Sequence, residues 1–216
     1  MPARCEECRQ LFAPQEDDKN LADRIEEIFP HCECEACTVG IGSPGPVLDS
    51  ESLHRFIVSP RDFEPEGGTL RPAAFNKVFD NGLSVCRDIA SDGDVIALTE
   101  EVLSSAAGKP HQSVCAVYEA SVQSIRLIHD ENGERVFGVY DLSILRSNPE
   151  KLPVPTHAGI FQRKPSKGVL NRKAMQKEFA YLLRELFERG RINLDEYRSG
   201  VLLRQNARAN AGEFEK

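Results

Sequence analysis

The sequence predicts an α+β fold: a mixed or mainly antiparallel sheet with packed helices, a small cysteine-rich module before it and a helical hairpin after it. Short alternating apolar segments separated by turn residues fill positions 49–163, which is typical of strands. Apolar residues recur at helical spacing near the C-terminus. Five of the seven cysteines lie in the first 37 residues. The predicted units are a module and linker at 1–48, an α+β domain at 49–163, and a helical extension of that domain at 164–216.

Composition and charge narrow the class of protein. The 216 residues are 40% hydrophobic and 28% charged, as in globular proteins. We find no apolar run near the roughly 18 residues of a membrane span and no secretory leader, so we expect a cytoplasmic protein with no membrane partner. The net charge of −7 argues against a protein coated in nucleic acid. Residues 146–216, however, carry 15 Lys/Arg and 8 Asp/Glu. This imbalance indicates a localised anionic partner, or contact between the two halves of the chain.

Two Cys-x-x-Cys pairs at the N-terminus predict a metal site. Cys5 and Cys8 form one pair, and Cys34 and Cys37 form the other. If each pair makes a tight turn, four thiolates meet at one tetrahedral Zn²⁺ ion. Four thiolates leave no open coordination position, so this zinc is expected to be structural rather than catalytic. The alternatives are free surface cysteines or a redox role for one pair.

With this spacing the module resembles a zinc ribbon. The 25 residues between the pairs exceed the usual gap of roughly 15–20, and an amphipathic helix predicted at 18–28 accounts for the difference. Cys32 and His31 are spare candidates that could replace one thiolate. The module is acidic, which favours a structural or protein-contacting role over nucleic-acid binding. The glycines and prolines of 40–46 then predict a linker.

The α+β domain is expected to alternate strands with short helices. Proline at the start of 72–79 favours a helix there, and Asn132-Gly133 is a hairpin signal. The predicted strands are 53–59, 83–87, 113–119, the hairpin 124–128 with 135–140, and 157–161; the predicted helices are 72–79 and 94–107.

Four residues of this domain are candidates for catalysis or binding. Alternation places Arg55 on an apolar face of its strand, where a guanidinium needs a carboxylate partner or an anionic ligand. Cys86 is a candidate nucleophile, with His157 or another histidine as its base. Glu119 is the fourth candidate. The alternative for each is a structural role: a buried ion pair for Arg55, a packed thiol for Cys86 and a hydrogen-bonded histidine for His157.

Short patches of this domain resemble known groups of proteins. Leu53-His54-Arg55-Phe56, Gly82-Leu83-Ser84-Val85 and Pro155-Thr156-His157-Ala158 resemble a group of small uncharacterised bacterial proteins, which implies no particular activity. A histidine or arginine on an early strand also resembles the NAD-binding strand of ADP-ribosyltransferase-like folds. That resemblance implies that Arg55 or His54 holds the dinucleotide and that Glu119 is the catalytic carboxylate. The serine-containing second motif and the paired-glutamate motif of those folds are absent.

The C-terminal extension combines cations with an apolar helix face. Residues 163–177 hold six Lys/Arg and no acidic residue. Apolar residues from Met175 to Phe187 share one face of a helix that ends near Gly190. Asn193 with Glu196 resembles the start of a second helix. Cations at a helix start favour phosphate or nucleic acid, unless they form a solvated face or pair with the acidic half. The candidate anion-binding residues are Arg163, Lys164, Lys167, Arg172 and Lys173.

These observations favour a zinc-stabilised bacterial binding or adaptor protein that contacts a protein, nucleic acid or other phosphate-bearing partner. The alternative is an enzyme on the central sheet, either ADP-ribosyltransferase-like or with another nucleotide-using activity.

Overall fold

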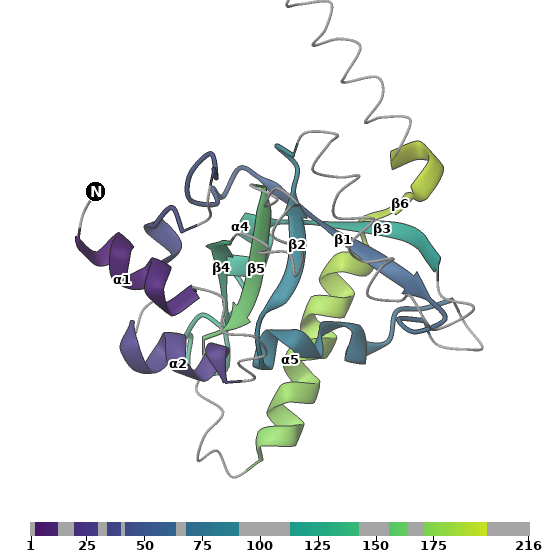
Figure 1. Cartoon of the computed structure of the whole chain (residues 1–216). Helices are drawn as coiled ribbons and strands as arrows, with labels where there is room; N and C mark the ends of the chain where they lie inside the picture. The colour runs from purple at the N-terminus through teal and green to yellow at the C-terminus, as the bar shows by residue number, and fades with distance from the viewer. Residues whose placement is uncertain are drawn as a thin grey trace, which may run out of the picture.

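Figure 1 shows the computed structural model of the chain. Six antiparallel strands form one sheet in the order β4-β5-β2-β1-β3-β6, with helices packed on it, so the predicted α+β class is confirmed. The strands are β1 (Ser52–Ser59), β2 (Leu83–Arg87), β3 (Ser113–Ser121), β4 (Phe137–Asp141), β5 (His157–Gln162) and β6 (Arg191–Asn193). The structure describes residues 3–12, 20–29, 34–39, 42–63, 68–90, 113–142, 156–163 and 171–197.

Three helical elements cover one face of the sheet. They are the 3-10 helix η2 (Pro72–Phe79), the short helix α4 (Val122–Arg126) and the helix α5 (Arg172–Glu188). The predicted helical face of α5 is buried, and its Phe187 ring lies 5.6 Å from the Phe75 ring of η2. Alternate residues of β1 and β2 complete this core, because successive strand residues point to opposite faces.

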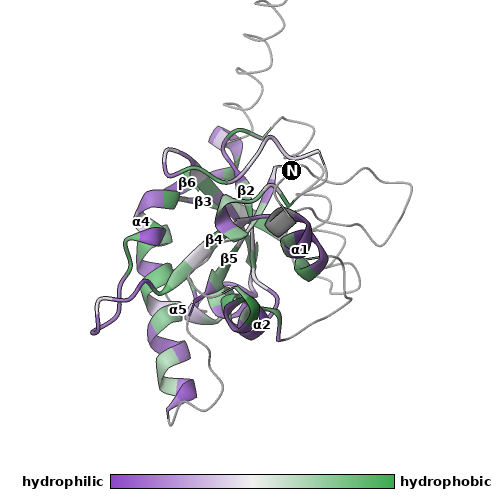
Figure 2. Cartoon of the chain, turned by 90° about the vertical axis from the view of Figure 1, so that its left-hand side faces the viewer, coloured by the Kyte–Doolittle hydropathy of each residue, from purple (hydrophilic) through white to green (hydrophobic). Residues whose placement is uncertain are grey.

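The N-terminal helices lie on the other face of the sheet. Helices α1 (Ala3–Phe12) and α2 (Leu21–Ile28) pack with Tyr140 of β4 and Phe161 of β5 in a second apolar cluster. The Phe12 and Tyr140 rings are 5.4 Å apart. Figure 2 shows α1 and α2 on one side of the strands and α4 and α5 on the other. Among the described helices, none is long and apolar enough to cross a membrane.

A buried arginine fastens the segment after the module to the sheet. The Arg87 guanidinium is 2% exposed and donates to both Glu51 carboxylate oxygens at 2.7 Å. It also donates to the Gly45 carbonyl at 2.7 Å and to Asp141 at 3.3 Å. The segment predicted from its composition to be a linker is therefore held against β2 and β4 from residue 43 onward.

Several predicted elements differ from the observed ones. The strand predicted at 124–128 is wrong: residues Val122–Arg126 form helix α4, because the Ser121 hydroxyl caps it by accepting from the Ser124 N–H at 3.0 Å. A capping serine at the end of a strand outweighs a short apolar alternation. The predicted hairpin is reduced to a bridge between His129 and Arg135. Residues 191–193 form the edge strand β6, and a described helical turn follows only at 194–197. The helix predicted at 94–107 lies outside the described residues.

Strands β1 and β2 meet over a short stretch only. Their ladder consists of the pairs Leu53–Arg87 and His54–Cys86. Figure 1 shows β1 and β3 turning away from the direction of β2 and β5 beyond this contact. Arg55 is the first residue of β1 after the ladder, so its side chain lies where the two strands part.

Candidate functional site

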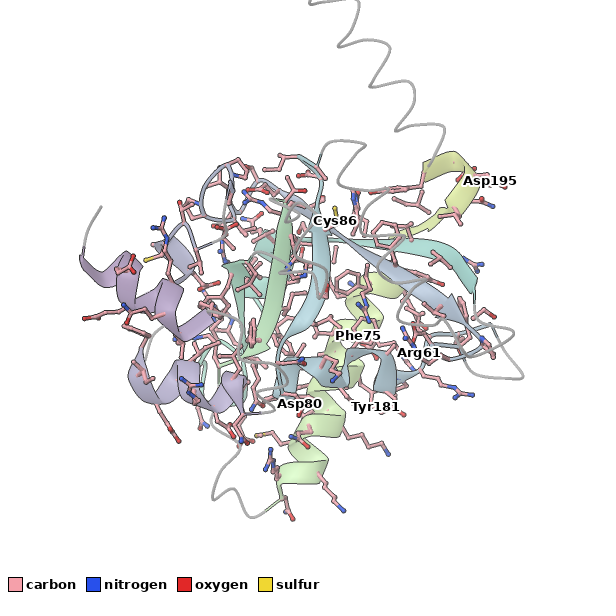
Figure 3. All side chains as sticks on the ribbon, in the orientation of Figure 1. Arg61, Phe75, Asp80, Cys86, Tyr181 and Asp195 are labelled. Atoms are coloured by element: carbon pink, nitrogen blue, oxygen red, sulfur yellow. A yellow bond between two sulfur atoms is a disulfide. The ribbon has the colours of Figure 1, made fainter. Side chains whose placement is uncertain are left out.

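Four polar or reactive side chains form one row across the sheet. His157 of β5 lies opposite Cys86 of β2, Cys86 lies opposite His54 of β1, and His54 lies opposite Glu119 of β3. Residues that are directly opposite each other on paired strands share one face, with Cβ atoms about 5 Å apart. Figure 3 labels Cys86 on β2 within this region. The fold thus brings together three of the four predicted candidates: His157, Cys86 and Glu119.

One end of the row is a hydrogen-bonded histidine. The His54 Nε2 atom lies 3.0 Å from a Glu119 carboxylate oxygen, and His54 Nδ1 lies 3.1 Å from the Tyr197 hydroxyl. The His54 side chain is 5% exposed, whereas that of Glu119 is 43% exposed. The buried ring therefore orients a carboxylate that solvent can reach. These are two of the residues that the ADP-ribosyltransferase resemblance selected.

The other end of the row is a hydroxyl–imidazole pair made by Ser84 and His157. The Ser84 Oγ atom lies 2.6 Å from His157 Nε2. Burial, together with the nearby charge of Arg55, lowers the pKa of His157 to about 3. The ring is therefore neutral at neutral pH and can accept the serine proton. His157 is buried, but Ser84 is exposed.

Arg55 binds the same residue, Ser84, through the main chain. Its Nη1 donates to the Ser84 carbonyl at 2.9 Å, and Nη2 lies 3.5 Å from the Ala74 carbonyl of η2. The Arg55 Nε is buried without a hydrogen-bond partner. Burial lowers the pKa of Arg55 to about 10, and Asp62 offsets part of this shift.

The Asp62 carboxylate, whose charge acts on Arg55, has other hydrogen-bond partners. Asp62 accepts two hydrogen bonds from the Arg61 side chain, at 2.8 and 2.9 Å, and one from the Val58 N–H at 3.0 Å. Within the described part of the chain, Arg55 therefore has backbone carbonyls rather than a carboxylate as its direct partners. This half-buried cation has the chemistry of an anion-binding group.

Cys86 is central in the row but fully enclosed. Its side chain is 0% exposed and packs with Phe56, Val58 and Val117. A nucleophile must reach its substrate, and in this structure the Cys86 sulfur has no exposed surface. Ser84, two residues earlier on the same face, is the exposed neighbour. Ser84 is not among the candidates predicted from the sequence, although strand alternation already places it on the same face as Cys86.

The N-terminal cysteines come together, one from each predicted pair. Cys8 and Cys34 form a disulfide, and Cys37, which directly follows the short 3-10 turn of residues 34–36, is buried. The tight turn predicted at the first pair is wrong, because both of its cysteines lie in helix α1. The described residues contain no cluster of three metal-ligating side chains. The side chain of Cys5 and the residues Cys32 and His31 lie outside the described part, so zinc remains a prediction.

The residues of the predicted basic cluster lie in different environments. The Arg163 side chain is 16% exposed, and its Nε lies 3.8 Å from a Glu26 oxygen of α2. Arg172 and Lys173 are exposed at the start of α5, whereas Lys164 and Lys167 lie outside the described residues. A groove of about 370 Å³ lies between the exposed sides of η2 and the first half of α5, lined by Pro72, Ala73, Asn76, Phe79, Asp80, Lys173, Gln176, Lys177 and Ala180.

Comparison with family models, curated proteins and solved structures finds no match for this chain. We therefore infer a function from the geometry of the sheet and from the chemistry of its side chains.

Proposed function

We propose that the protein binds a phosphate-bearing, nucleotide-like ligand at the Arg55 site, where the guanidinium lies beside the main-chain carbonyls of Ser84 and Ala74. This proposal rests on the burial and the hydrogen-bond partners of the Arg55 guanidinium. It is half-buried, its direct partners are two carbonyl oxygens, and the nearby Asp62 is engaged by Arg61 and a backbone N–H.

A phosphate group supplies what this guanidinium lacks. Burial disfavours its charge, as the lowered pKa of Arg55 reflects. An anion beside it offsets that cost, and the planar fork of arginine donors matches two phosphoryl oxygens. The lysines of the η2–α5 groove are a second possible contact for an extended anionic partner.

An ADP-ribosyltransferase-like activity is the second candidate. The observation that favours it is the 3.0 Å contact between His54 and Glu119 next to the Arg55 strand position. In that case the ligand is a dinucleotide and Glu119 is the catalytic carboxylate. Glu119→Gln should abolish NAD cleavage and leave the binding of pyrophosphate at Arg55 intact. NAD left uncleaved by the wild-type protein under all conditions that sustain pyrophosphate binding would reject this candidate.

The N-terminal module has a stabilising role in the same proposal. In the reduced chain, the thiolates of Cys8, Cys34 and Cys37, together with that of Cys5, form the zinc site that the sequence predicts. A sulfur in a disulfide is not a thiolate ligand, so metal binding requires reduction of the Cys8–Cys34 bond. The module carries an acidic surface suited to a protein partner, as expected of an adaptor.

Replacing Arg55 with glutamine should weaken pyrophosphate binding by roughly 10- to 100-fold, because each charge-assisted hydrogen bond contributes about 1.5–3 kcal/mol. Isothermal titration calorimetry of the full chain with pyrophosphate measures the change. Arg191→Gln, which removes an exposed arginine on edge strand β6, is the matched control and should bind like the wild type. Equal affinities for wild type and Arg55→Gln would remove Arg55 from the site. If Lys173→Glu/Lys177→Glu alone abolished binding, the anion would belong to the groove.

Reduction should create zinc-binding capacity of about one ion per chain, because the predicted site uses four thiolates around one metal. Metal analysis after anaerobic reduction, zinc loading and desalting measures the ratio. Cys37→Ser should reduce zinc retention sharply, whereas Cys86→Ala, outside the module, should leave it unchanged. A ratio well below one zinc per chain in the fully reduced wild type would refute the metal module.

A further inference from the structure

The groove between η2 and α5 has an apolar floor beneath a polar rim. Its lining residues on α5 are Lys173, Gln176, Lys177 and Ala180, which follow helical spacing and therefore share one face of the helix. Ala180 and Phe79 of η2 are buried, whereas the two lysines are exposed. Figure 1 shows η2 lying across α5. The volume of about 370 Å³ falls within the roughly 300–1,000 Å³ of ligand-binding clefts.

Positive charge continues from the groove along α5. Lys173, Lys177, Tyr181 and Arg184 also recur at helical spacing and lie on one side of the helix. Lys177 Nζ lies 5.8 Å from the centroid of the Tyr181 ring, and Arg184 Cζ lies 4.8 Å from it. Figure 3 labels Tyr181 on α5. These cation–π contacts hold two of the cations beside the ring, so the α5 wall of the groove presents a basic stripe.

Two amide side chains line the groove from opposite walls. Asn76 belongs to η2 and Gln176 to α5, and neither side chain makes a hydrogen bond to another described residue. An amide offers both N–H donors and a carbonyl acceptor. A peptide main chain needs the same combination of partners, because each of its residues carries one donor and one acceptor.

We propose that this groove binds an extended acidic peptide segment of a partner protein. Lys173 and Lys177 are separated by about 6 Å along the helix axis. Alternate side chains of an extended chain are about 6.6 Å apart and point to the same side. Carboxylates two residues apart in the peptide therefore meet the two lysines, while the amides of Asn76 and Gln176 bond its main chain. This inference goes beyond the phosphate-bearing ligand, since Arg55 does not line the groove.

A peptide fits this surface better than a nucleic acid does. Among the described residues that line the groove, Asp80 is acidic, and its carboxylate repels a continuous row of phosphates. A peptide with spaced acidic residues can place an uncharged residue there. Single-stranded nucleic acid binds by stacking its bases on aromatic rings, but Lys177 and Arg184 already approach the ring of Tyr181.

Fluorescence anisotropy of the full-length protein with a labelled seven-residue peptide, glutamate at its third and fifth positions, tests the proposal. We expect saturable binding that Lys173→Ala/Lys177→Ala weakens by about 10-fold, because two exposed ion pairs are lost. Ala73→Phe fills the groove from an exposed position without changing charge and should also weaken binding. Arg189→Ala/Arg191→Ala removes the same charge at the other end of α5 and should bind like the wild type.

The contrary results are equally specific. Unchanged affinity in the Lys173/Lys177 variant, or the same loss in the Arg189/Arg191 control, would overturn the groove as the peptide site. Tighter binding of an oligothymidylate than of the peptide, with the same dependence on Lys173 and Lys177, would replace the peptide by a nucleic acid. Arg55→Gln should bind the peptide normally, so a failure of pyrophosphate binding at Arg55 leaves this proposal standing, and the reverse also holds.

Discussion

Replacing Arg87 with methionine should destabilise the folded protein by about 3–5 kcal/mol, since removal of one partner from a buried ion pair leaves uncompensated charge. Arg87 is 2% exposed, and it neutralises Glu51 and Asp141, which are themselves buried. It also satisfies the Gly45 and Pro46 carbonyls. The substitution keeps most of the side-chain volume, so the loss reports on charge and hydrogen bonding rather than on a cavity.

Chemical denaturation at neutral pH measures this change. Arg191→Met, on the exposed edge strand, is the matched control and should alter stability by less than about 0.5 kcal/mol. The triple variant Arg87→Met/Glu51→Gln/Asp141→Asn should recover part of the loss, because it also removes the buried carboxylate charges. An Arg87→Met variant as stable as the control would show that this network does not hold residues 43–51 to the sheet.

Acidification should cost the wild type roughly 4–5 kcal/mol through His157 alone. Burial and the charge of Arg55 lower its pKa to about 3 from the ordinary 6.5, and each pKa unit corresponds to about 1.36 kcal/mol. Below pH 6.5 the unfolded chain takes up a proton that the folded chain does not. The contribution is therefore fully present above about pH 6.5 and is lost progressively as the pH falls toward 3.

The measurement compares wild type with His157→Gln by denaturation at several pH values. Glutamine keeps a polar group near Ser84 but has no proton to gain, so the stability advantage of the wild type over the variant should shrink on acidification. Asp and Glu side chains titrate in both proteins, and the difference between the two curves removes their shared contribution. A difference that stays constant from pH 7 to pH 4 would contradict a buried neutral His157.

The sequence predicted the scaffold of this site better than its contacts. Alternation correctly placed Arg55 on the same face of β1 as Leu53 and Ile57, both of which are buried. The partners of Arg55 could not be predicted, because they are the main-chain carbonyls of Ser84 and Ala74. Every residue has such a carbonyl, so the sequence does not distinguish these two. The β1–β2 ladder ends at His54, so the Ser84 carbonyl of β2 lies beyond its last pair.

Contacts that depend on strand register could not be predicted from the sequence either. Ser84 looked like an ordinary residue of a short strand until β5 placed His157 within 2.6 Å of its hydroxyl. His54 and Tyr197 meet across 143 positions of sequence. A shift of one residue in the β2–β5 pairing would turn the Ser84 and His157 side chains to opposite faces of the sheet. Local sequence patterns therefore cannot identify such a pair.

The most direct test of the central claim is an NMR titration of the full-length protein with pyrophosphate, observing the arginine Nε–Hε resonances. The Arg55 signal is assigned by its loss in Arg55→Lys. We predict that it shifts in a saturable manner, with the same midpoint that calorimetry gives, while the Arg191 signal stays in place. Saturable shifts confined to Arg172 at the start of α5, with the Arg55 signal unmoved, would contradict an anion site at Arg55.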